Sequence, residues 1–260
     1  MSDTPDLAGK AARRLPPFPD WKDHALFVDF DGTLVPIVER PQDVRLSDST
    51  WHLLRRVIRA SDGAVAVLSG RALESLSGHL QGLPLALSGS HGLERLLPDG
   101  RPVMAEDGAP AGALERAFAR LKPLARSEGL LLEHKPGAVA LHYRNRPDRA
   151  EICQAAVARV AEAQELRVLH GNMVSEAALA GVDKGQALRR FLAEAPFANR
   201  IPIMVGDDTT DEDGFRAAQE LGGFGVRIGQ ADTVARFRVP RMEDALSWLS
   251  ASLEAEPERR

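Results

Sequence analysis

Two aspartates at the end of an apolar run place the strongest constraint on how this chain folds. The run Ala25 to Phe30 reads as a short buried strand. Asp29 and Asp31 lie at its end, and Gly32 follows immediately. Side chains two apart on a strand point to the same side, and like charges that close repel. Burying such carboxylates without partners is costly. The pair therefore predicts a metal ion, a phosphate held by cations, or both, although an ordinary strand followed by an Asp-Gly turn has the same local sequence.

Composition excludes several classes of protein. A chain of 260 residues holds one large domain or two modest ones, and its 44% hydrophobic and 27% charged residues are typical of a soluble globular protein. The net charge of -4 gives no reason to expect nucleic acid or an anionic membrane as a partner. We see no apolar run of the roughly 20 residues that a spanning helix needs, and no signal-peptide core. Cys153 is the single cysteine, which favours a reducing cytoplasm.

Strands and helices alternate at both ends of the chain. Solidly apolar runs at 64–68, 83–87 and 201–205 predict strands, and a helical pattern follows the first and the last of them. Ser47 reads as the N-cap of a helix over 49–60. Strands that are apolar throughout indicate a parallel sheet covered on both faces. Residues 1–20 read as a flexible lead-in.

The middle of the chain follows a different pattern. Segments 130–134 and 138–143 flank a Lys-Pro-Gly turn, which predicts a hairpin, and segments 166–169 and 173–176 predict a second strand pair. Helical patterns cover 113–125 and 148–165. These elements predict a small α+β unit inserted into the α/β fold. We therefore expect a Rossmann-like core made of residues 1–101 and 177–260, and an α+β cap domain at 102–176.

Polar clusters follow the apolar strands, where sites form in open parallel sheets. Ser69-Gly70-Arg71 follows one strand, a run from Asp207 to Asp213 follows another, and Lys184 begins a helix. Carboxylates suit Mg²⁺, and a hydroxyl and an ammonium suit phosphate. Taken singly, these groups fit a capping serine, an exposed lysine and a solvated helix start, the last interpretation fitting Glu212 and Asp213 best.

The order of these motifs resembles that of the haloacid dehalogenase-type (HAD) phosphatases. The quoted stretches are DFDGT, LSGR, an isolated lysine and GDDTTDED, and the insert between the second and third motifs corresponds to a cap. The chain is more similar still to the trehalose-6-phosphate phosphatases, through DFDGTLVPI, GSHGLE, the Glu133-His134-Lys135 segment, His142-Tyr143-Arg144 and Glu176.

This resemblance implies catalytic and metal-binding roles. Asp29 would be the nucleophile and Asp31 the general acid and base, while Ser69 and Lys184 would hold the phosphoryl group. Mg²⁺ would be the cofactor. Its ligands would be Asp29, the main-chain carbonyl of Asp31 and Asp207, with Asp208 or Asp211 behind them.

The resemblance also implies a substrate, trehalose 6-phosphate, and the residues that contact it. Those residues would be Gly70, Arg71, His91, Glu133, Lys135, His142, Arg144 and Glu176. The physiological partner would be the trehalose-phosphate synthase. From the residues alone, Glu133 and Lys135 share a strand face and equally fit a surface ion pair. Other functions left open are another capped sugar phosphatase, acting for instance on sucrose phosphate or a glycosyl phosphoglycerate, a phosphosugar mutase, or a non-catalytic sugar-phosphate-binding domain.

Overall fold

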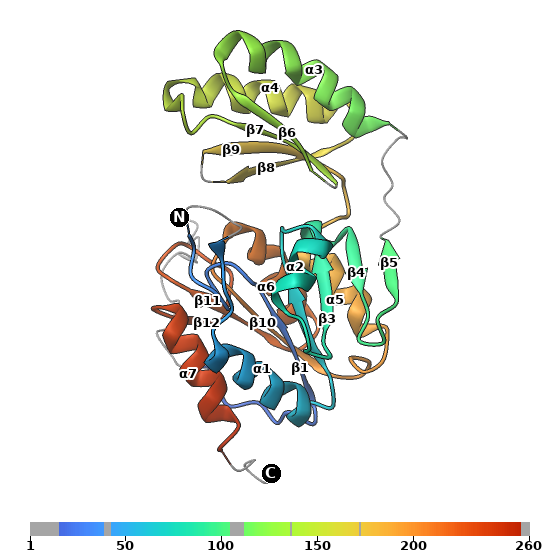
Figure 1. The fold of residues 1–260 in the computed structure, drawn as a ribbon, viewed down its shortest axis with the longest axis vertical. Helices are drawn as coiled ribbons and strands as arrows, with labels where there is room; N and C mark the ends of the chain where they lie inside the picture. Colours follow the sequence, from blue (N-terminus) through green and yellow to red (C-terminus); the bar gives the residue numbers. More distant parts are fainter. Residues whose placement is uncertain (1–15, 39–42, 105–111, 136, 172, 256–260) are drawn as a thin grey trace, which may run out of the picture.

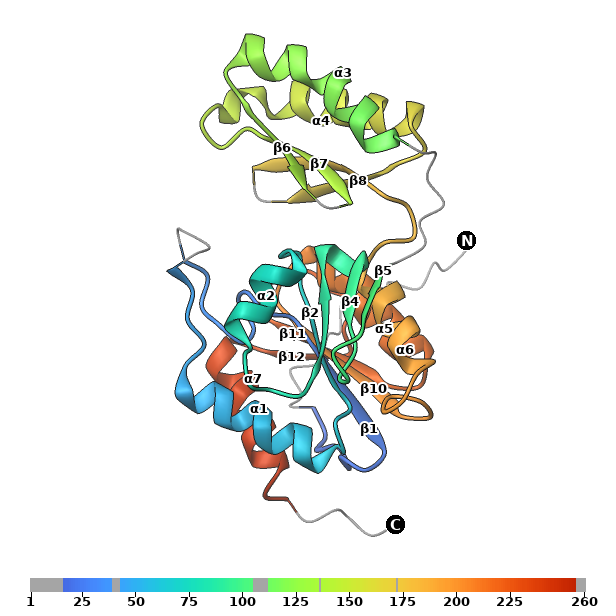
Figure 2. The same ribbon diagram turned by 45° about the vertical axis from the view of Figure 1, so that its right-hand side comes forward.

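Two β-sheets organise the chain (Figure 1). The computed structural model describes residues 16–38, 43–104, 112–135, 137–171 and 173–255, and within these ranges one sheet has eight strands and the other four. Both views place the smaller sheet, with its two helices, beyond the ends of the strands of the larger one (Figures 1 and 2). No helix in the described ranges is long and apolar enough to cross a membrane.

The larger sheet has the order β12-β11-β10-β1-β2-β3-β4-β5. Neighbours from β12 to β3 run parallel, while β4 and β5 are antiparallel additions at one edge. The strands are β1 (His24–Val28), β2 (Val65–Leu68), β3 (Ala86–Gly89), β4 (Glu94–Leu96), β5 (Pro102–Met104), β10 (Ile201–Gly206), β11 (Phe224–Ile228) and β12 (Phe237–Val239).

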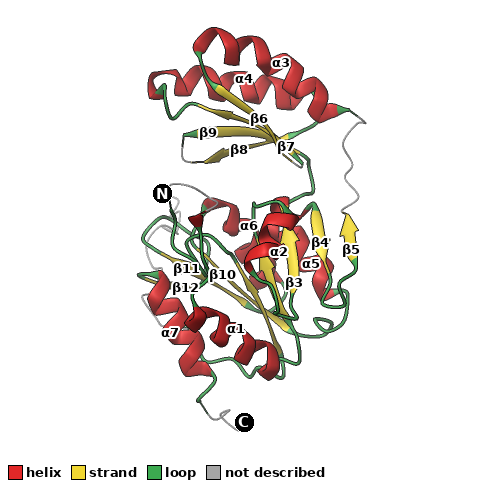
Figure 3. Cartoon of the chain, in the orientation of Figure 1, coloured by secondary structure: helices red, strands yellow, loops and turns green. Residues whose placement is uncertain are grey.

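Helices cover both faces of this sheet, as the solidly apolar strands predict (Figure 3). On β1, Leu26 and Val28 belong to the hydrophobic cluster that also includes residues of α1 (Asp48–Ala60), α2 (Leu73–His79) and α7 (Met242–Ser252). Ala25 and Phe27 belong to the opposite cluster, with α5 (Lys184–Leu192) and α6 (Glu212–Glu220). The predicted cap of α1 is confirmed, since the Ser47 side chain accepts from the Thr50 N–H.

The smaller sheet is antiparallel, with the order β6-β7-β9-β8. Its strands are β6 (Leu131–Lys135), β7 (Ala138–His142), β8 (Arg167–Gly171) and β9 (Val174–Ala178), and its helices are α3 (Ala113–Glu128) and α4 (Ala150–Ala163). Val139 and Leu141 of β7 pack with these helices. The alternate residues of β7 therefore lie on the opposite face, which Figure 1 shows turned toward the larger sheet.

Several elements differ from the expectation. The strand expected at 83–87 is β3 (Ala86–Gly89), because Pro84 has no N–H to donate to a ladder. Strands β4, β5 and β12 have three residues each and give no recognisable apolar run. β5 pairs with β4 in the larger sheet, although the sequence pattern places residue 102 in the insert. β9 ends in the smaller sheet at Ala178, beyond the expected boundary at 176.

The segment expected to be flexible, residues 1–20, falls partly outside the described residues, which begin at 16. Two of its last five residues are buried. Pro16 and Pro19 are buried, and the Trp248 indole N–H donates to the Pro16 carbonyl at 3.1 Å.

Candidate active site

Strand register brings the first and last acidic motifs together. β1 pairs with β10 in parallel, with Val28 beside Val205, and the Asp29 N–H donates to the Val205 carbonyl at 2.9 Å. Asp29 and Asp207 therefore leave adjacent strands at the same edge of the sheet. The alternation that sends Phe27 toward α5 and α6 sends Asp29 the same way.

Lys184 is the buried cation of the site. It is 2% exposed, and its Nζ lies 2.6 Å from Asp29 Oδ1 and 2.6 Å from Asp211 Oδ1. The lysine opens α5, whose N-cap Asp183 accepts from the Gln186 N–H. The alternative of an exposed helix lysine is therefore wrong. Removing one partner of a buried pair costs about 3–5 kcal/mol, so this contact strongly constrains the site.

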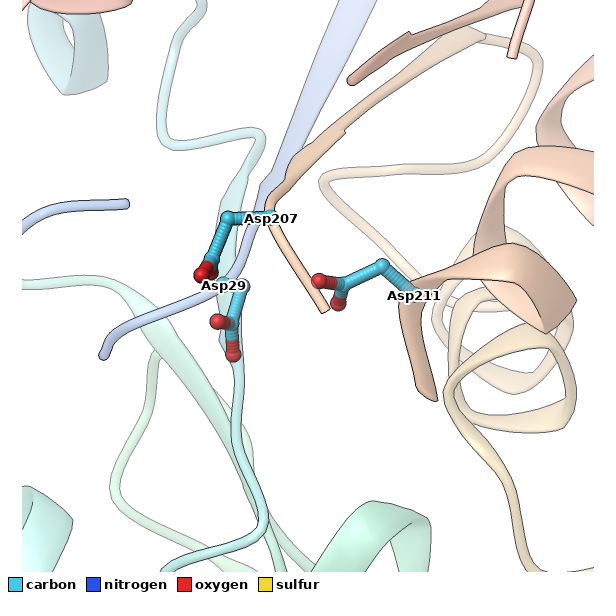
Figure 4. A group of neighbouring side chains, drawn as sticks. All are labelled: Asp29, Asp207 and Asp211. Atoms are coloured by element: carbon cyan, nitrogen blue, oxygen red, sulfur yellow. The ribbon is translucent and has the colours of Figure 1, made fainter. Parts of the chain in front are cut away.

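Three carboxylates converge beside this lysine (Figure 4). Asp29, Asp207 and Asp211 each offer one oxygen atom, and these atoms lie within 4.8 Å of one another. Thr33 Oγ1 donates to Asp207 Oδ1 at 3.2 Å. Hard oxygen donors fit Mg²⁺, which usually takes one or two carboxylates directly and fills its other positions with water and phosphate oxygens, so two of the three would be enough.

The charges in this cluster are not balanced. Burial raises the pKa of Asp29 well above its usual value against the attraction of Lys184, and Asp211 and Asp207 raise it further. Burial also raises the pKa of Asp207 to about 6, with Asp211 adding to the effect. Burial acts to lower the pKa of Lys184, but Asp211 and Asp29 together raise it, so the ammonium stays charged. The cluster therefore favours a further proton or a cation.

Two glycines leave room for these carboxylates. A Cβ built on Gly32 would lie 2.2 Å from Asp207 Oδ2, and one built on Gly206 would lie 2.3 Å from the Asp211 carboxyl carbon. Real Cβ atoms do not approach this closely. The glycine of each motif is thus explained by the packing of an aspartate, Asp207 from the other motif at Gly32 and Asp211 from the same motif at Gly206.

Asp31 has a cation of its own, which corrects the expectation of one positive group between Asp29 and Asp31. Arg71 Nε lies 2.6 Å from Asp31 Oδ2, and its Nη2 lies 2.7 Å from Oδ1. The strand ends at Val28 and the chain turns at Gly32, whose φ is +82°, so the alternation of a strand does not extend to Asp31. The proposed metal contact of Asp31 through its carbonyl stays a prediction.

The geometry places Asp211 in the carboxylate cluster and Asp208 outside it. Asp208 is exposed, and its Oδ1 accepts from the Thr209 N–H at 2.7 Å. The Asp208 N–H in turn donates to Asp211 Oδ2 at 2.9 Å. The two residues form a capping box around the short helix η4 (Thr209–Asp211). Asp208 thus orients Asp211, which makes the contact with Lys184.

The end of β2 lies beside His91. Ser69 is buried, and its Oγ accepts from the Arg71 N–H at 3.1 Å. A Cβ on Gly70 would lie 2.6 Å from the imidazole of His91. The Ser90 hydroxyl, just before His91, donates to the Glu94 carboxylate at 2.7 Å, which fixes this turn. Burial, with Lys184 second, lowers the pKa of His91 to about 4, so the imidazole is neutral at pH 7.

The smaller sheet presents polar side chains on the face away from its helices. Lys135 Nζ lies 2.7 Å from Glu176 Oε1, and His142 Nε2 lies 2.8 Å from Glu133 Oε2. The expected shared face of Glu133 and Lys135 is present, but each residue pairs across strands and not with the other. Arg144 is exposed in the turn that follows β7.

A cleft of about 340 Å³ separates this sheet from the main one. Its walls come from β8 and from the first turns of α5 and α6, and His91 and Lys184 form part of the lining. Arg167 spans it, with Nη1 3.1 Å from Asp183 Oδ2 and Nη2 2.9 Å from Asp213 Oδ2. The other lining residues are Val168, Leu169, His170, Val182, Thr209, Thr210, Glu212 and Arg216.

Sequence reasoning missed these lining residues of β8 and the threonines, and it misjudged two carboxylates. Glu212 and Asp213 were expected in a solvated helix start. Glu212 is instead 9% exposed and lies 3.3 Å from Arg227, while Asp213 pairs with Arg167. The predicted pairing of segments 166–169 and 173–176 is confirmed by β8 and β9, but no local signal marks Arg167 as a residue of the cleft.

Comparison with solved structures defines the class. A phosphatase of the haloalkanoate (HAD) superfamily from Bacteroides thetaiotaomicron has the same fold, with a TM-score of 0.65 and 17% identity over 92% of this chain and 97% of that one. The structure shares the fold of this HAD phosphatase, an α/β core with a parallel sheet and an additional antiparallel α+β unit. A family model described as trehalose-phosphatase matches residues 27–240, and the chain belongs to this family.

Two relatives agree with this assignment. The trehalose-6-phosphate phosphatase of Escherichia coli strain K12 is 32% identical, over 100% of this chain and 93% of that protein. The crystal form 2 structure of the Aspergillus fumigatus trehalose-6-phosphate phosphatase has a TM-score of 0.67 and 27% identity, covering 91% of this chain and 96% of that one.

Proposed function

We propose that this protein is a Mg²⁺-dependent phosphatase that hydrolyses trehalose 6-phosphate through an aspartyl-phosphate intermediate. The observation that carries the proposal is the buried cluster at the end of β1, where Asp29 lies 2.6 Å from Lys184 and close to Asp207 and Asp211. A carboxylate in this position can act as a nucleophile if cations neutralise the phosphate that approaches it.

In the first step an Asp29 carboxylate oxygen attacks phosphorus. The bond between phosphorus and the sugar oxygen breaks, and Asp31 gives its proton to that oxygen, which leaves as a hydroxyl. In the second step Asp31 takes a proton from water, the water oxygen attacks phosphorus, and the bond to Asp29 breaks, which frees phosphate. Lys184 and the Ser69 hydroxyl hold the phosphoryl oxygens throughout. A Mg²⁺ ion, held by Asp29, Asp207 and the Asp31 carbonyl with Asp211 behind them, would supply further positive charge.

Arg71 has to release Asp31 before Asp31 can take up the proton that it gives to the sugar oxygen. Both Asp31 oxygens accept from Arg71 in this structure, so the guanidinium lies beside the proposed general acid and base. A guanidinium binds phosphate as well as carboxylate. Arg71 therefore exchanges Asp31 for the substrate, in line with its expected contact with substrate.

The choice of substrate is supported by the family and by the polar face of the smaller sheet. The two relatives are named as trehalose-6-phosphate phosphatases. Glu133, Lys135, His142 and Glu176 offer paired polar groups that suit sugar hydroxyls, and Arg144 lies farther out. The proposal includes a cap domain that begins after β5 and ends with β9 at Ala178, a cytoplasmic setting and a trehalose-phosphate synthase that supplies the substrate.

Phosphate release from a panel of sugar phosphates tests this function. Wild-type protein with Mg²⁺ should prefer trehalose 6-phosphate to sucrose 6-phosphate and glucose 6-phosphate, and chelator should abolish turnover. Asp29→Asn should lower kcat by about 10⁴-fold or more while keeping the fold, because the amide is isosteric but not nucleophilic. A preference for another sugar phosphate would replace the substrate, and turnover in chelator would remove the metal. No turnover on any ester would favour a binding domain.

A further inference from the structure

A buried arginine lies beneath the loop that carries the proposed metal ligands. Arg227 is on β11, next to β10, and the strand register places it beside Gly206, the residue before Asp207. Its side chain is 6% exposed. A buried arginine is costly unless its donors find acceptors, so its contacts identify what this position stabilises.

The contacts of Arg227 are with both ends of the loop. Its Nη1 donates to the Asp208 carbonyl at 2.7 Å and to Glu212 Oε1 at 3.3 Å. The other oxygen of Glu212, Oε2, accepts from the Val234 N–H at 2.9 Å, so this carboxylate is held from two sides. One guanidinium therefore fixes the residue that precedes η4 and the residue that follows it.

Between these two anchor points lies Asp211. Its Oδ2 accepts from the Asp208 N–H and its Oδ1 lies 2.6 Å from Lys184. A shift of the loop at Asp208 or Glu212 would therefore displace Asp211. It would also move Asp207, which directly precedes Asp208. The loop also concentrates negative charge, with five carboxylates from Asp207 to Asp213, and Arg227 supplies a positive charge beneath them.

We propose that Arg227 is a positioning residue of the metal site: through the Asp208 carbonyl and Glu212 it holds Asp207 and Asp211 where a divalent cation can use them. The inference rests on the proposed Mg²⁺ requirement. Groups that orient metal ligands in this way change metal affinity by about 10–100-fold when they are removed.

Arg95 provides a matched control for a purely structural role. It is also a buried arginine of the larger sheet, on β4, with a side chain 7% exposed and a glutamate, Glu194, at 3.2 Å. Its guanidinium packs 5.2 Å from the centre of the Phe191 ring, away from the acidic loop. Losing either arginine removes a buried ion pair, but of the two only Arg227 contacts the acidic loop that follows β10.

The test is the dissociation constant of Mg²⁺, measured by titration calorimetry without substrate on wild type, Arg227→Met, Arg227→Lys and Arg95→Met. Unfolding curves give the folded fraction of each. We expect Arg227→Met to weaken Mg²⁺ binding by about 10–100-fold, and Arg227→Lys to recover most of that loss through its charge and one donor. Arg95→Met should lower Tm and leave the Mg²⁺ constant within about twofold of wild type.

Three results would overturn the inference: an unchanged constant in Arg227→Met, an equal loss in Arg95→Met, or a lysine variant as weak as the methionine variant. If Arg227→Met does not fold, Glu212→Gln takes its place, and a constant equal to that of wild type would then overturn it. Wild-type protein that binds no Mg²⁺ would overturn the metal requirement itself, which distinguishes the two failures.

Discussion

Asp207 lies among more carboxylates than cations, and its protonation therefore links stability to pH. Burial and Asp211 raise its pKa to about 6, above the ordinary aspartate value of 3.8. The folded state thus keeps a proton that the unfolded state releases between about pH 4 and 6. The stability gained from this proton is complete below pH 4 and is lost as the pH rises through 6. His91, with its pKa lowered to about 4, has the opposite effect on stability, because its contribution is lost as the pH falls over the same range.

The difference between wild type and Asp207→Asn reports on this carboxylate and on its effect on Asp29, because His91 contributes to both. In metal-stripped protein we expect equal Tm values near pH 4 and a higher Tm for the variant at pH 8. The difference should be about 2–4 °C for each kcal/mol that removing the buried charge adds to the free energy of unfolding. Excess Mg²⁺ at pH 8 should reverse the order by stabilising wild type. Scanning calorimetry across pH 4–8 measures both effects. A variant with no advantage at pH 8 would contradict the raised pKa.

At the scale of elements, the end of β10 depends on a glycine. A methyl group at Gly206 would overlap the Asp211 carboxylate and push it from Lys184. Gly206→Ala should lower kcat/KM by at least about 10²-fold, the cost of a misplaced catalytic group, and lower Tm. Gly78→Ala is the control, since Gly78 lies within α2 and a Cβ added there would meet nothing within 4 Å. It should keep activity and gain slightly in stability. Normal activity in Gly206→Ala would show that Asp211 can move without consequence.

The strands of the smaller sheet are expected to select the sugar. Glu176 is 7% exposed and holds Lys135 at 2.7 Å, so Glu176→Gln should loosen a pair that suits sugar hydroxyls. A site built for particular hydroxyls penalises ligands that leave its groups unpaired. We expect kcat/KM for trehalose 6-phosphate to fall by about 10-fold or more, while that for p-nitrophenyl phosphate changes by less than about twofold. Parallel losses on both esters would assign Glu176 to folding or to the chemistry.

How far the sequence predicts this structure depends on whether a contact is local. The apolar runs of β1, β2 and β10 and the Ser47 cap of α1 are determined by neighbouring residues, and they were predicted correctly. Asp29 and Lys184 were assigned to one site because each begins or ends an element at the same sheet edge. The Arg71–Asp31 pair and the burial of Glu212 against Arg227 depend on side-chain packing between distant segments, which no local pattern encodes. The position of Arg167 in the cleft was equally hidden, although the pairing of β8 with β9 was predicted.

On the scale of the whole molecule, Arg167 joins the smaller sheet to the larger one. Its ion pairs with Asp183 and Asp213 span the cleft beside Lys184. Arg167→Ala should let the two parts separate, and kcat/KM should fall by about 10-fold because closure excludes water and brings sugar contacts to the phosphate site. Arg126→Ala, an exposed arginine on the outer helix α3, should have neither effect.

Spin labels on Glu162→Cys and Arg56→Cys would report the distance between α4 and α1, and the buried Cys153 should not react. We expect a broader distribution in Arg167→Ala than in wild type, and a narrower one for wild type when Mg²⁺ and a substrate analogue are added. Identical distributions in all three samples would show that the two parts move as one body.

The pairing of β1 with β10 has a consequence for the order in which the chain acquires its properties during synthesis. His24 lies beside Ile201, so one of the two neighbours of the central strand is synthesised 177 residues later. The smaller sheet and its helices, residues 113–178, are contiguous and close locally, and contacts near in sequence form first. A ribosome-bound chain should therefore hold a folded insert between two unfinished halves of the main sheet. Asp29 gains Asp207 and Asp211 only after β10 emerges, so catalytic competence is the last property this chain acquires.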